Sequence, residues 1–336
     1  MSPNESILSL HHADIGFLRK KNSIRLLTDI NLQVPGGELI GLVGRNGSGK
    51  STILRTLVRL QPVLQGEIRI NSRKSEQIHS NEFAKIMAYV ASGLEFSEGM
   101  TVRELVSLGR FPFTNWIGRI EKEDKILIDQ AIQSVGIESL SNKKLIEISD
   151  GERQKAMIAR TLAQNSQIII LDEPTAFLDL PSKYDIINLL YELTRNGKTI
   201  IYSTHDLNIA MRFSDKIWLI DNNTIRDGSP EDLVLNKTLA TIFDSDKIKL
   251  NDKTGDFDLN RNFSKSISLK AENSELFYWT KQAMQRSGYE VVEYENENLQ
   301  VQVFHKEDKI IWKISSSNVE SEVQSIYQLI SELNKC

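Results

Sequence analysis

Several features that would place a chain in a specialised class are missing from this sequence. A single cysteine, Cys336, occurs among 336 residues, so an internal disulfide is excluded and a reducing compartment is expected. Seven prolines and 18 glycines are too few for a collagen-like or low-complexity chain.

Long hydrophobic segments are also missing. The densest apolar stretch, residues 167–171, is far shorter than the roughly 20 residues that a membrane-spanning helix needs. Residues 1–10 lack a basic start followed by an apolar segment, so no signal peptide is predicted. We therefore expect a soluble protein that reaches a membrane only through a partner.

Neither sign of charge is in excess. Lys and Arg number 41 against 45 Asp and Glu, a formal net charge of −4, so the composition does not support a nucleic acid partner. With 40% hydrophobic and 26% charged residues, the chain has the composition of an ordinary globular protein, and its length allows one large domain or two.

We predict two domains, at residues 1–244 and 263–336, joined by a polar, Asp-rich linker at 245–262. In the first domain, short β-branched apolar runs alternate with helical patterns, which is typical of an α/β fold around a parallel sheet. The predicted strands are 39–43, 167–171, 199–203 and 216–220, and the predicted helices are 51–60, 123–135, 152–163, 183–195 and 207–213. Segments 8–12 and 28–34 alternate apolar and polar residues and predict a small antiparallel sheet.

The second domain is predicted to be a small α+β domain. A helical pattern over 274–287 precedes alternating segments at 289–294, 299–305 and 310–315, which predict a three-stranded meander. A second helix is predicted over 319–334, since four apolar residues share one helical face there: Val323, Ile326, Ile330 and Leu333. No motif in this domain indicates a chemical role, so a packing or dimerisation module is the simplest interpretation.

The strongest motif is GRNGSGKS at residues 44–51, a complete phosphate-loop pattern between a predicted strand and a predicted helix. Its glycines let the backbone approach a polyphosphate and present N–H groups at a helix N-terminus. Lys50 would contact the β- and γ-phosphates, and the Ser51 hydroxyl would ligate magnesium. The candidate nucleotide-binding residues here are Gly44, Asn46, Gly47, Gly49, Lys50, Ser51 and Thr52.

A second motif, IIILDE at residues 168–173, is an apolar run that ends in two carboxylates. A strand of this kind places Asp172 and Glu173 at the carboxyl edge of a parallel sheet, where ligands bind. Strands also end in acids merely because acids are well solvated, but the phosphate loop favours a functional role. Asp172 is predicted to hold magnesium, and Glu173 to polarise the attacking water.

A third motif indicates the family. SDGERQ at residues 149–154 opens a predicted helix and resembles the signature motif of the ATP-binding cassette (ABC) ATPases, usually Leu-Ser-Gly-Gly-Gln. FLD at 177–179 looks like the D-loop of that family, THD at 204–206 looks like its switch histidine, and Phe17 matches the aromatic residue that stacks on adenine. The resemblance covers about residues 6–243. It implies an ABC-type P-loop fold with a RecA-like core, a small antiparallel β subdomain and a helical signature subdomain.

The resemblance also implies an activity and partners. The chain would hydrolyse ATP with Mg2+ as cofactor, and Glu173 and His205 would be catalytic. Ser149, Gly151 and Glu152, at a helix N-terminus, would contact the γ-phosphate held by a second copy in a head-to-tail dimer. A lone copy should be a poor ATPase. Transmembrane permease subunits would hold the protein, otherwise cytoplasmic, on the inner face of the cell membrane.

Two positions depart from the family pattern. Tyr-Val-Pro-Gln is replaced by Tyr-Val-Ala-Ser, so Ser92 stands where a glutamine normally touches magnesium and water. Glu95 is a candidate substitute for that glutamine. Asp150 replaces the first signature glycine and adds a negative charge, so we expect its side chain to point away from the phosphate site.

Residues 100–112 give the best indication of cargo. They are similar to a stretch in ATPase subunits of iron-siderophore, haem and vitamin B12 importers, and the aromatic residues Phe111, Phe113 and Trp116 would suit a permease groove. Metal-chelate import is therefore preferred over other ABC import. The alternatives are a soluble, non-transport ABC ATPase and a regulatory subunit with weak hydrolysis. The presence of Lys50, Asp172, Glu173 and His205 argues against weak hydrolysis.

Overall fold

The computed structural model describes residues 6–19, 22–93, 99–114, 119–251, 255–259, 261, 263, 265–292, 299–316 and 319–335. The chain forms two compact units, one of Met1–Phe243 with Leu250–Asp256, the other of Asp244–Lys249 with Phe257–Cys336. The boundary at residue 244 and the linker at 245–262 stay predictions. In the described part of that linker, β11 (Ile248–Leu250) and β12 (Phe257–Leu259) form a two-stranded sheet.

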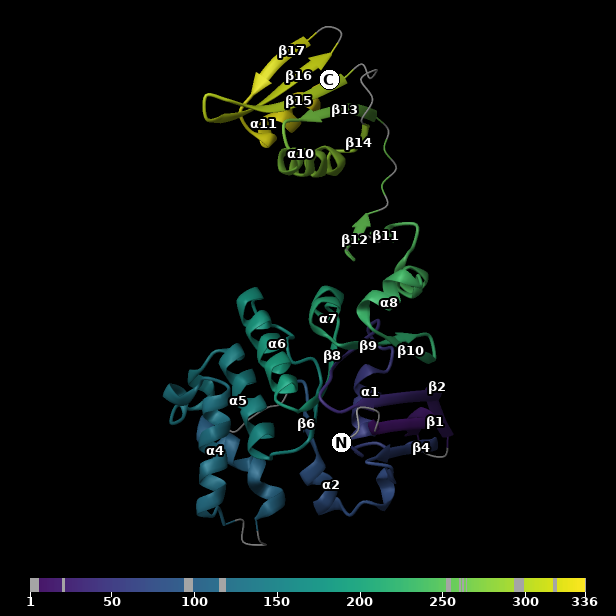
Figure 1. Ribbon diagram of the computed structural model, residues 1–336, viewed down its shortest axis with the longest axis vertical. Coiled ribbons are helices and arrows are strands. Elements are labelled where there is room, and N and C mark those ends of the chain that lie inside the picture. The colour runs from purple at the N-terminus through teal and green to yellow at the C-terminus, as the bar shows by residue number, and fades with distance from the viewer. Residues whose placement is uncertain are drawn as a thin grey trace. The chain divides into compact units, whose positions relative to one another are not determined.

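A six-stranded sheet forms the centre of the first unit (Figure 1). In spatial order its strands are β10 (Thr224–Gly228), β9 (Lys216–Asp221), β3 (Leu39–Val43), β8 (Thr199–Thr204), β7 (Ile168–Leu171) and β6 (Met87–Val90). Every neighbouring pair is parallel except β9 with β10. The predicted parallel sheet is confirmed, and its central strands are buried along their whole length because both faces are covered.

The alternation of side chains along β7 shows how the two faces are covered. Ile168 and Ile170 pack in a cluster with residues of α1 (Lys50–Leu57) and of the antiparallel sheet. Ile169 and Leu171 pack in a second cluster with residues of the helices from α3 to α7. The other helices of this unit are α2 (Ser80–Ile86), α3 (Val102–Ser107), α4 (Lys122–Ser134), α5 (Asp150–Ala163), α6 (Leu180–Arg195), α7 (Leu207–Phe213), α8 (Pro230–Leu235) and α9 (Thr238–Phe243).

The predicted antiparallel sheet is also present. Its strand order is β2-β1-β4-β5, with β1 (Ser6–Arg19), β2 (Asn22–Pro35), β4 (Gln65–Ile70) and β5 (Arg73–Lys74). Neighbouring strands are antiparallel throughout. Leu8, Leu10 and Leu32, which alternate with polar residues, are buried on its inner face.

Helices α3, α4 and α5 pack together as a helical subdomain, and Figure 1 shows α4 and α5 away from β1 and β2. A 3-10 helix over Leu108–Phe113 follows α3. The Phe111 side chain is exposed, whereas the Phe113 ring is partly covered by the guanidinium of Arg110 at 3.8 Å. Trp116 and Glu95 lie outside the described residues.

The second unit differs from its predicted topology. Its five-stranded sheet has the order β14-β13-β15-β16-β17, with β13 (Lys265–Ala271), β14 (Tyr289–Val292), β15 (Leu299–Lys306), β16 (Lys309–Ser316) and β17 (Val319–Val323). The three-stranded meander was wrong, because β13 lies between β14 and β15 and is parallel to both. The helix predicted over 319–334 was wrong in its first part, where β17 pairs with β16. Helices α10 (Ser274–Arg286) and α11 (Ile326–Leu333) complete a separate hydrophobic core.

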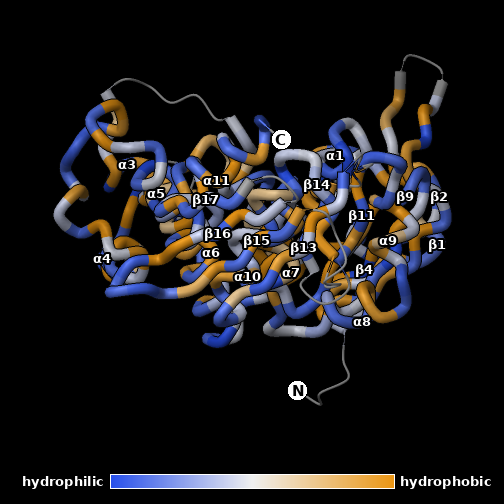
Figure 2. The backbone as a smooth tube through the Cα atoms, turned by 90° about the horizontal axis from the view of Figure 1, so that it is seen from above, coloured by the Kyte–Doolittle hydropathy of each residue, from blue (hydrophilic) through white to orange (hydrophobic). Residues whose placement is uncertain are grey.

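Hydrophobic segments are short throughout the described chain. Figure 2 shows hydrophobic and hydrophilic stretches alternating along the tube. Among the described residues, no helix is long and apolar enough to cross a membrane.

Candidate functional site

The phosphate loop lies between β3 and α1, at the carboxyl edge of the parallel sheet. Gly47 and Gly49 adopt φ values of +76° and +105°, a region that favours glycine, and Gly49 is the residue from which α1 begins. A side chain at Gly47 would meet open space, so the glycine serves the backbone conformation and leaves the loop accessible. The loop therefore presents backbone groups at a helix N-terminus, as an anion site requires.

Lys50 places a buried cation beneath this loop. Its side chain is only 5% exposed, and Nζ donates to the carbonyl oxygen of Gly44 at 3.0 Å. Burial lowers the pKa of Lys50, and the nearby carboxylates of Glu173 and Asp172 act in the opposite direction. The loop therefore holds the Lys50 ammonium where it could contact a bound phosphate.

Asp172 follows β7 and is almost fully buried. Its Oδ1 accepts hydrogen bonds from Ser51 Oγ at 3.2 Å and from Ser203 Oγ at 2.8 Å. Its Oδ2 is buried and has no hydrogen-bond partner in the described chain. A buried carboxylate oxygen without a donor, next to a serine hydroxyl, suits a hard cation with oxygen ligands. The residues present therefore fit Mg2+.

Glu173 and His205 lie beside Asp172 at the carboxyl edge of the sheet. His205 Nε2 lies 2.8 Å from Glu173 Oε2, which brings together the two residues predicted to be catalytic. The Glu173 backbone has a φ of +54°, a strained conformation for a side chain of this size, and its N–H donates to Ser203 Oγ at 2.8 Å. The structure thus fixes the direction of the Glu173 side chain through both its backbone and its partner.

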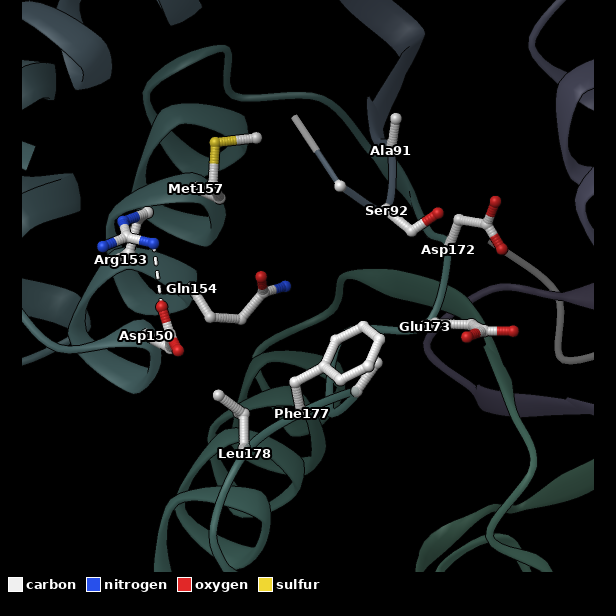
Figure 3. A pocket seen from close by; sticks show the side chains of 12 residues that line it. Ala91, Ser92, Asp150, Arg153, Gln154, Met157, Asp172, Glu173, Phe177 and Leu178 are labelled. Atoms are coloured by element: carbon white, nitrogen blue, oxygen red, sulfur yellow. Dashed lines mark hydrogen bonds and ion pairs between the residues drawn. The ribbon is translucent and has the colours of Figure 1, made fainter. Parts of the chain in front are cut away.

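An open cleft of about 550 Å³ faces these carboxylates (Figure 3). Asp172 and Glu173 line it together with Ser92 from the end of β6. Helix α5 contributes Asp150 and Gln154 to the facing wall. Ser92 therefore occupies the same cleft as Asp172, although the role of its hydroxyl stays a prediction.

The signature motif forms the N-terminus of α5, where Ser149 and Glu152 make a capping box. Ser149 Oγ accepts from the Glu152 N–H at 3.3 Å, while Glu152 Oε2 accepts from the Ser149 N–H at 2.8 Å. The Ser149 N–H holds the pKa of Glu152 below its usual value, against the effect of burial. Ser149 is exposed, and neither it nor Gly151 belongs to the described lining of the cleft that contains Asp172. Their contact with a second copy stays a prediction.

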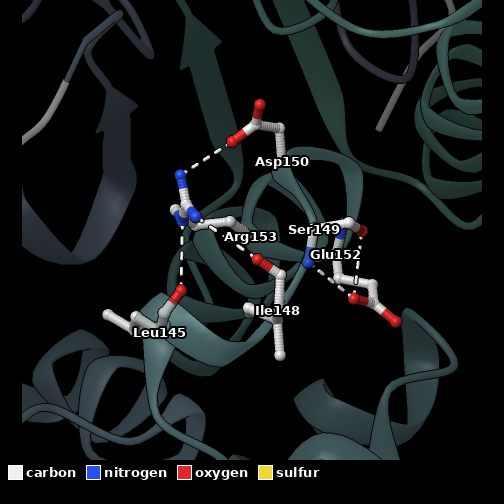
Figure 4. A network of polar contacts seen from close by, with 6 residues as sticks. All are labelled: Leu145, Ile148, Ser149, Asp150, Glu152 and Arg153. Carbon is white, nitrogen blue, oxygen red and sulfur yellow. Dashed lines mark hydrogen bonds and ion pairs between the residues drawn. The ribbon is translucent and has the colours of Figure 1, made fainter.

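Asp150 is neutralised by Arg153 one turn later, at 2.8 Å (Figure 4). The same guanidinium donates to the carbonyl oxygens of Leu145 and Ile148, both at 3.3 Å. Arg153 thus ties the aspartate to the segment that precedes α5. Whether the Asp150 side chain points away from a phosphate stays a prediction.

The remaining predicted residues lie on other elements. Phe17 is a partly exposed residue of β1, paired with Ile24 of β2. Phe177 is 99% exposed with a φ of +63°, and the Asp179 side chain accepts from the Ser182 N–H at the start of α6. The structure therefore brings together Lys50, Ser51, Asp172, Glu173 and His205, but not Phe17 or the signature residues.

Ser203 contacts both acidic residues and was not predicted from the sequence. Ser203 ends the buried strand β8 and lies beside Asp172 across the parallel pair β7–β8. A polar residue at the carboxyl end of a buried strand, directly before the Thr204–His205 pair, was the available signal.

Replacing Ser203 by alanine should lower the free energy of unfolding by about 1–3 kcal/mol, because the N–H of Glu173 loses its acceptor and the buried Oδ1 of Asp172 loses a donor. Urea unfolding measures this loss. Ser166→Ala is the matched control, since Ser166 is equally buried and its hydroxyl has no partner in the described structure. Equal losses in the two variants would contradict a specific role for Ser203.

Three family models match the chain. The model described as "ABC transporter" matches residues 27–176, and "Iron ABC transporter C-terminal domain" matches residues 264–334. The model "AAA domain, putative AbiEii toxin, Type IV TA system" matches residues 144–212. The first spans the phosphate loop through the acidic pair, and the second falls within the second unit.

Relatives and solved structures agree with these matches. The achromobactin transport ATP-binding protein of Dickeya dadantii is 36% identical over 223 residues, 66% of this chain and 83% of that protein. The ferric enterobactin transport ATP-binding protein of Escherichia coli is 35% identical over 217 residues, 64% and 80% of the two chains. A dimeric bacterial ABC transporter cassette, MJ0796, superposes with a TM-score of 0.58 at 28% identity over 66% of this chain and 98% of that one. A putative metal-chelate type ABC transporter superposes with a TM-score of 0.62 at 24% identity, over 71% and 89%. The chain therefore belongs to the family of ABC transporter ATP-binding proteins.

Proposed function

We propose that this protein is the ATP-hydrolysing subunit of an importer that takes up iron chelates. One observation carries the enzymatic part: Lys50, Asp172, Glu173 and His205 converge at the carboxyl ends of three neighbouring parallel strands, β3, β7 and β8. A cation in a phosphate loop, a carboxylate for a metal ion and a carboxylate paired with histidine are the parts that phosphoryl transfer to water needs.

The nucleotide is held mainly by backbone and charge. The N–H groups of the loop and the Lys50 ammonium bind the phosphates, and the exposed Phe17 ring stacks on the adenine. Ser51 and Asp172 would hold Mg2+, which neutralises phosphate charge when it is bound.

Glu173 orients the attacking water and accepts its proton as the new bond to the γ-phosphorus forms and the bond to the β–γ bridging oxygen breaks. His205, at 2.8 Å, holds the Glu173 carboxylate in place. It would also contact the γ-phosphate of bound ATP. Ser203 fixes the backbone of Glu173, so the carboxylate is oriented before the substrate arrives.

A second copy would complete each site. The N-terminus of α5, with Ser149, Gly151 and Glu152, would contact the γ-phosphate bound by the partner in a head-to-tail dimer. Two observations support this proposal: Phe177 exposes a whole aromatic ring next to the catalytic edge, and the similar cassette MJ0796 is described as dimeric.

The cargo and the domains are inferred from the relatives. Several of them are named for siderophore transport, among them the achromobactin and ferric enterobactin proteins, and residues 264–334 match an iron-transporter C-terminal model. We therefore assign residues 1–244 to the cassette, 245–262 to a linker and 263–336 to a C-terminal domain of iron transporters. The protein would act at the inner face of the cell membrane, bound to permease subunits.

Uptake measurements test the cargo. Deletion of the gene should reduce uptake of 55Fe-labelled ferric siderophore, and a plasmid copy should restore it. A copy carrying Glu173→Gln, which lacks the proposed base, should not restore uptake. Normal iron uptake together with lost cobalamin or haem uptake would reject the siderophore and leave the ATPase assignment in place.

A further inference from the structure

Tyr89 lies next to the proposed magnesium ligand but on a different strand. In the parallel pair β6–β7, Tyr89 stands opposite Ile170, two residues before Asp172. Side chains two positions apart on a strand share a face, so Tyr89 and Asp172 lie on the same face of the sheet. This is the face that α1 covers, since Ser51 of α1 donates to Asp172 and Tyr89 packs against the cluster that contains Ile170.

Two buried oxygen atoms in this region have no hydrogen-bond partner in the described chain. They are the Tyr89 hydroxyl oxygen and Oδ2 of Asp172. Burial raises the pKa of Tyr89, and the Asp172 carboxylate raises it further, whereas the cation of Arg55 acts in the opposite direction. A tyrosine hydroxyl is a hydrogen-bond donor, and the nearby Oδ2 is an acceptor that lacks a donor in the described chain.

We propose that Tyr89 is a positioning residue for Asp172. Its hydroxyl donates a hydrogen bond to Oδ2 and orients the carboxylate toward the metal ion that accompanies ATP. A carboxylate oxygen has two lone pairs, so Oδ2 can accept this hydrogen bond and still ligate a cation.

Tyr89 is retained in this chain, whereas the glutamine that usually follows three residues later is replaced by Ser92. The Ser92 side chain is shorter than the glutamine of the family pattern, so its hydroxyl has less reach toward the magnesium site. Tyr89 offers a hydroxyl from inside the fold, at the end of a rigid ring. The inference rests on the proposed role of Asp172 as a magnesium ligand.

The test compares ATP binding with and without Mg2+, by calorimetry on the full-length protein. In Tyr89→Phe the gain in ATP affinity caused by Mg2+ should fall by about fivefold, the expected loss for one net hydrogen bond. ATP affinity in EDTA should not change. Tyr89→Met, which keeps an apolar side chain and lacks the hydroxyl, is the second variant and should show the same loss.

Tyr202→Phe is the matched control. Tyr202 is a fully buried tyrosine of β8 whose hydroxyl bonds Ser214 Oγ at 2.9 Å, so its variant loses a hydroxyl without touching Asp172. Its dependence on Mg2+ should equal that of the wild type. If the wild type binds ATP equally with and without Mg2+, the proposed role of Asp172 fails. If the wild type depends on Mg2+ and the Tyr89 variants keep that dependence, only the inference about Tyr89 is overturned.

Discussion

Glu173→Gln should lower ATP turnover by about 100-fold or more and leave ATP binding nearly unchanged. The substitution keeps the size of the side chain and its hydrogen bond to His205, which lies at 2.8 Å. It removes the carboxylate that accepts the proton of the attacking water. The phosphate loop and Lys50 are untouched, so the nucleotide should still bind.

The same variant should become a stable dimer when ATP is added, because ATP that is not hydrolysed stays between the two copies. Size-exclusion chromatography with and without ATP, together with a phosphate-release assay, measures both effects. Glu231→Gln, an exposed position at the start of α8, is the control and should behave like the wild type. Turnover near the wild-type rate in Glu173→Gln would move the base to another residue, and Glu95 would be examined next.

The phosphate loop and the two acidic residues could be placed from the sequence because each is marked by a local pattern. A phosphate loop requires a strand before it and a helix after it, and β3 and α1 fulfil that requirement. The apolar run before Asp172 predicts a buried strand, and parallel strands bring their carboxyl ends to one edge. Asp172 and Glu173 could therefore be placed at the same edge of the sheet as the loop without knowledge of the strand order.

Contacts between neighbouring strands could not be predicted in the same way. Ser203 supports Asp172 and Glu173 only because β8 lies next to β7, and that order is a property of the whole sheet. The Tyr89 hydroxyl near Asp172 likewise depends on the register of β6 against β7. A single sequence contains the residues but not these long-range pairings.

The second unit shows the same limit at the level of topology. β13 was not predicted from the sequence. Its pairings with β14 and β15 are parallel, so helix α10 separates it along the chain from both partners. Val323 shares a helical spacing with Ile326 and Ile330, which favoured one long helix. The structure instead ends β17 at Val323 and starts α11 after Ser325, whose side chain accepts from the Gln328 N–H. A helix cap inside the periodic pattern was the local signal that separates strand from helix.

Lys50→Ala should weaken ATP binding by about 100-fold, while the protein stays folded. Lys50 supplies a buried cation to the phosphate loop, and a charge-assisted bond to a phosphate is among the strong polar interactions. Burial already lowers the pKa of this lysine, so its removal also relieves a desolvation cost in the free protein. The variant should therefore lose affinity and not stability.

Lys198→Ala separates the loss of a buried lysine from the loss of this particular one. Burial lowers the pKa of Lys198 as well, and its Nζ donates to the carbonyl oxygen of Ser166 at 2.8 Å. Lys198 precedes β8, at the amino edge of the sheet, whereas the phosphate loop lies at the carboxyl edge. Its variant should bind ATP like the wild type, and its unfolding curve should show that it stays folded. Calorimetry measures the ATP affinity of both variants, and urea unfolding shows whether they stay folded. If Lys50→Ala binds ATP as tightly as Lys198→Ala does, the loop does not bind the nucleotide through its lysine.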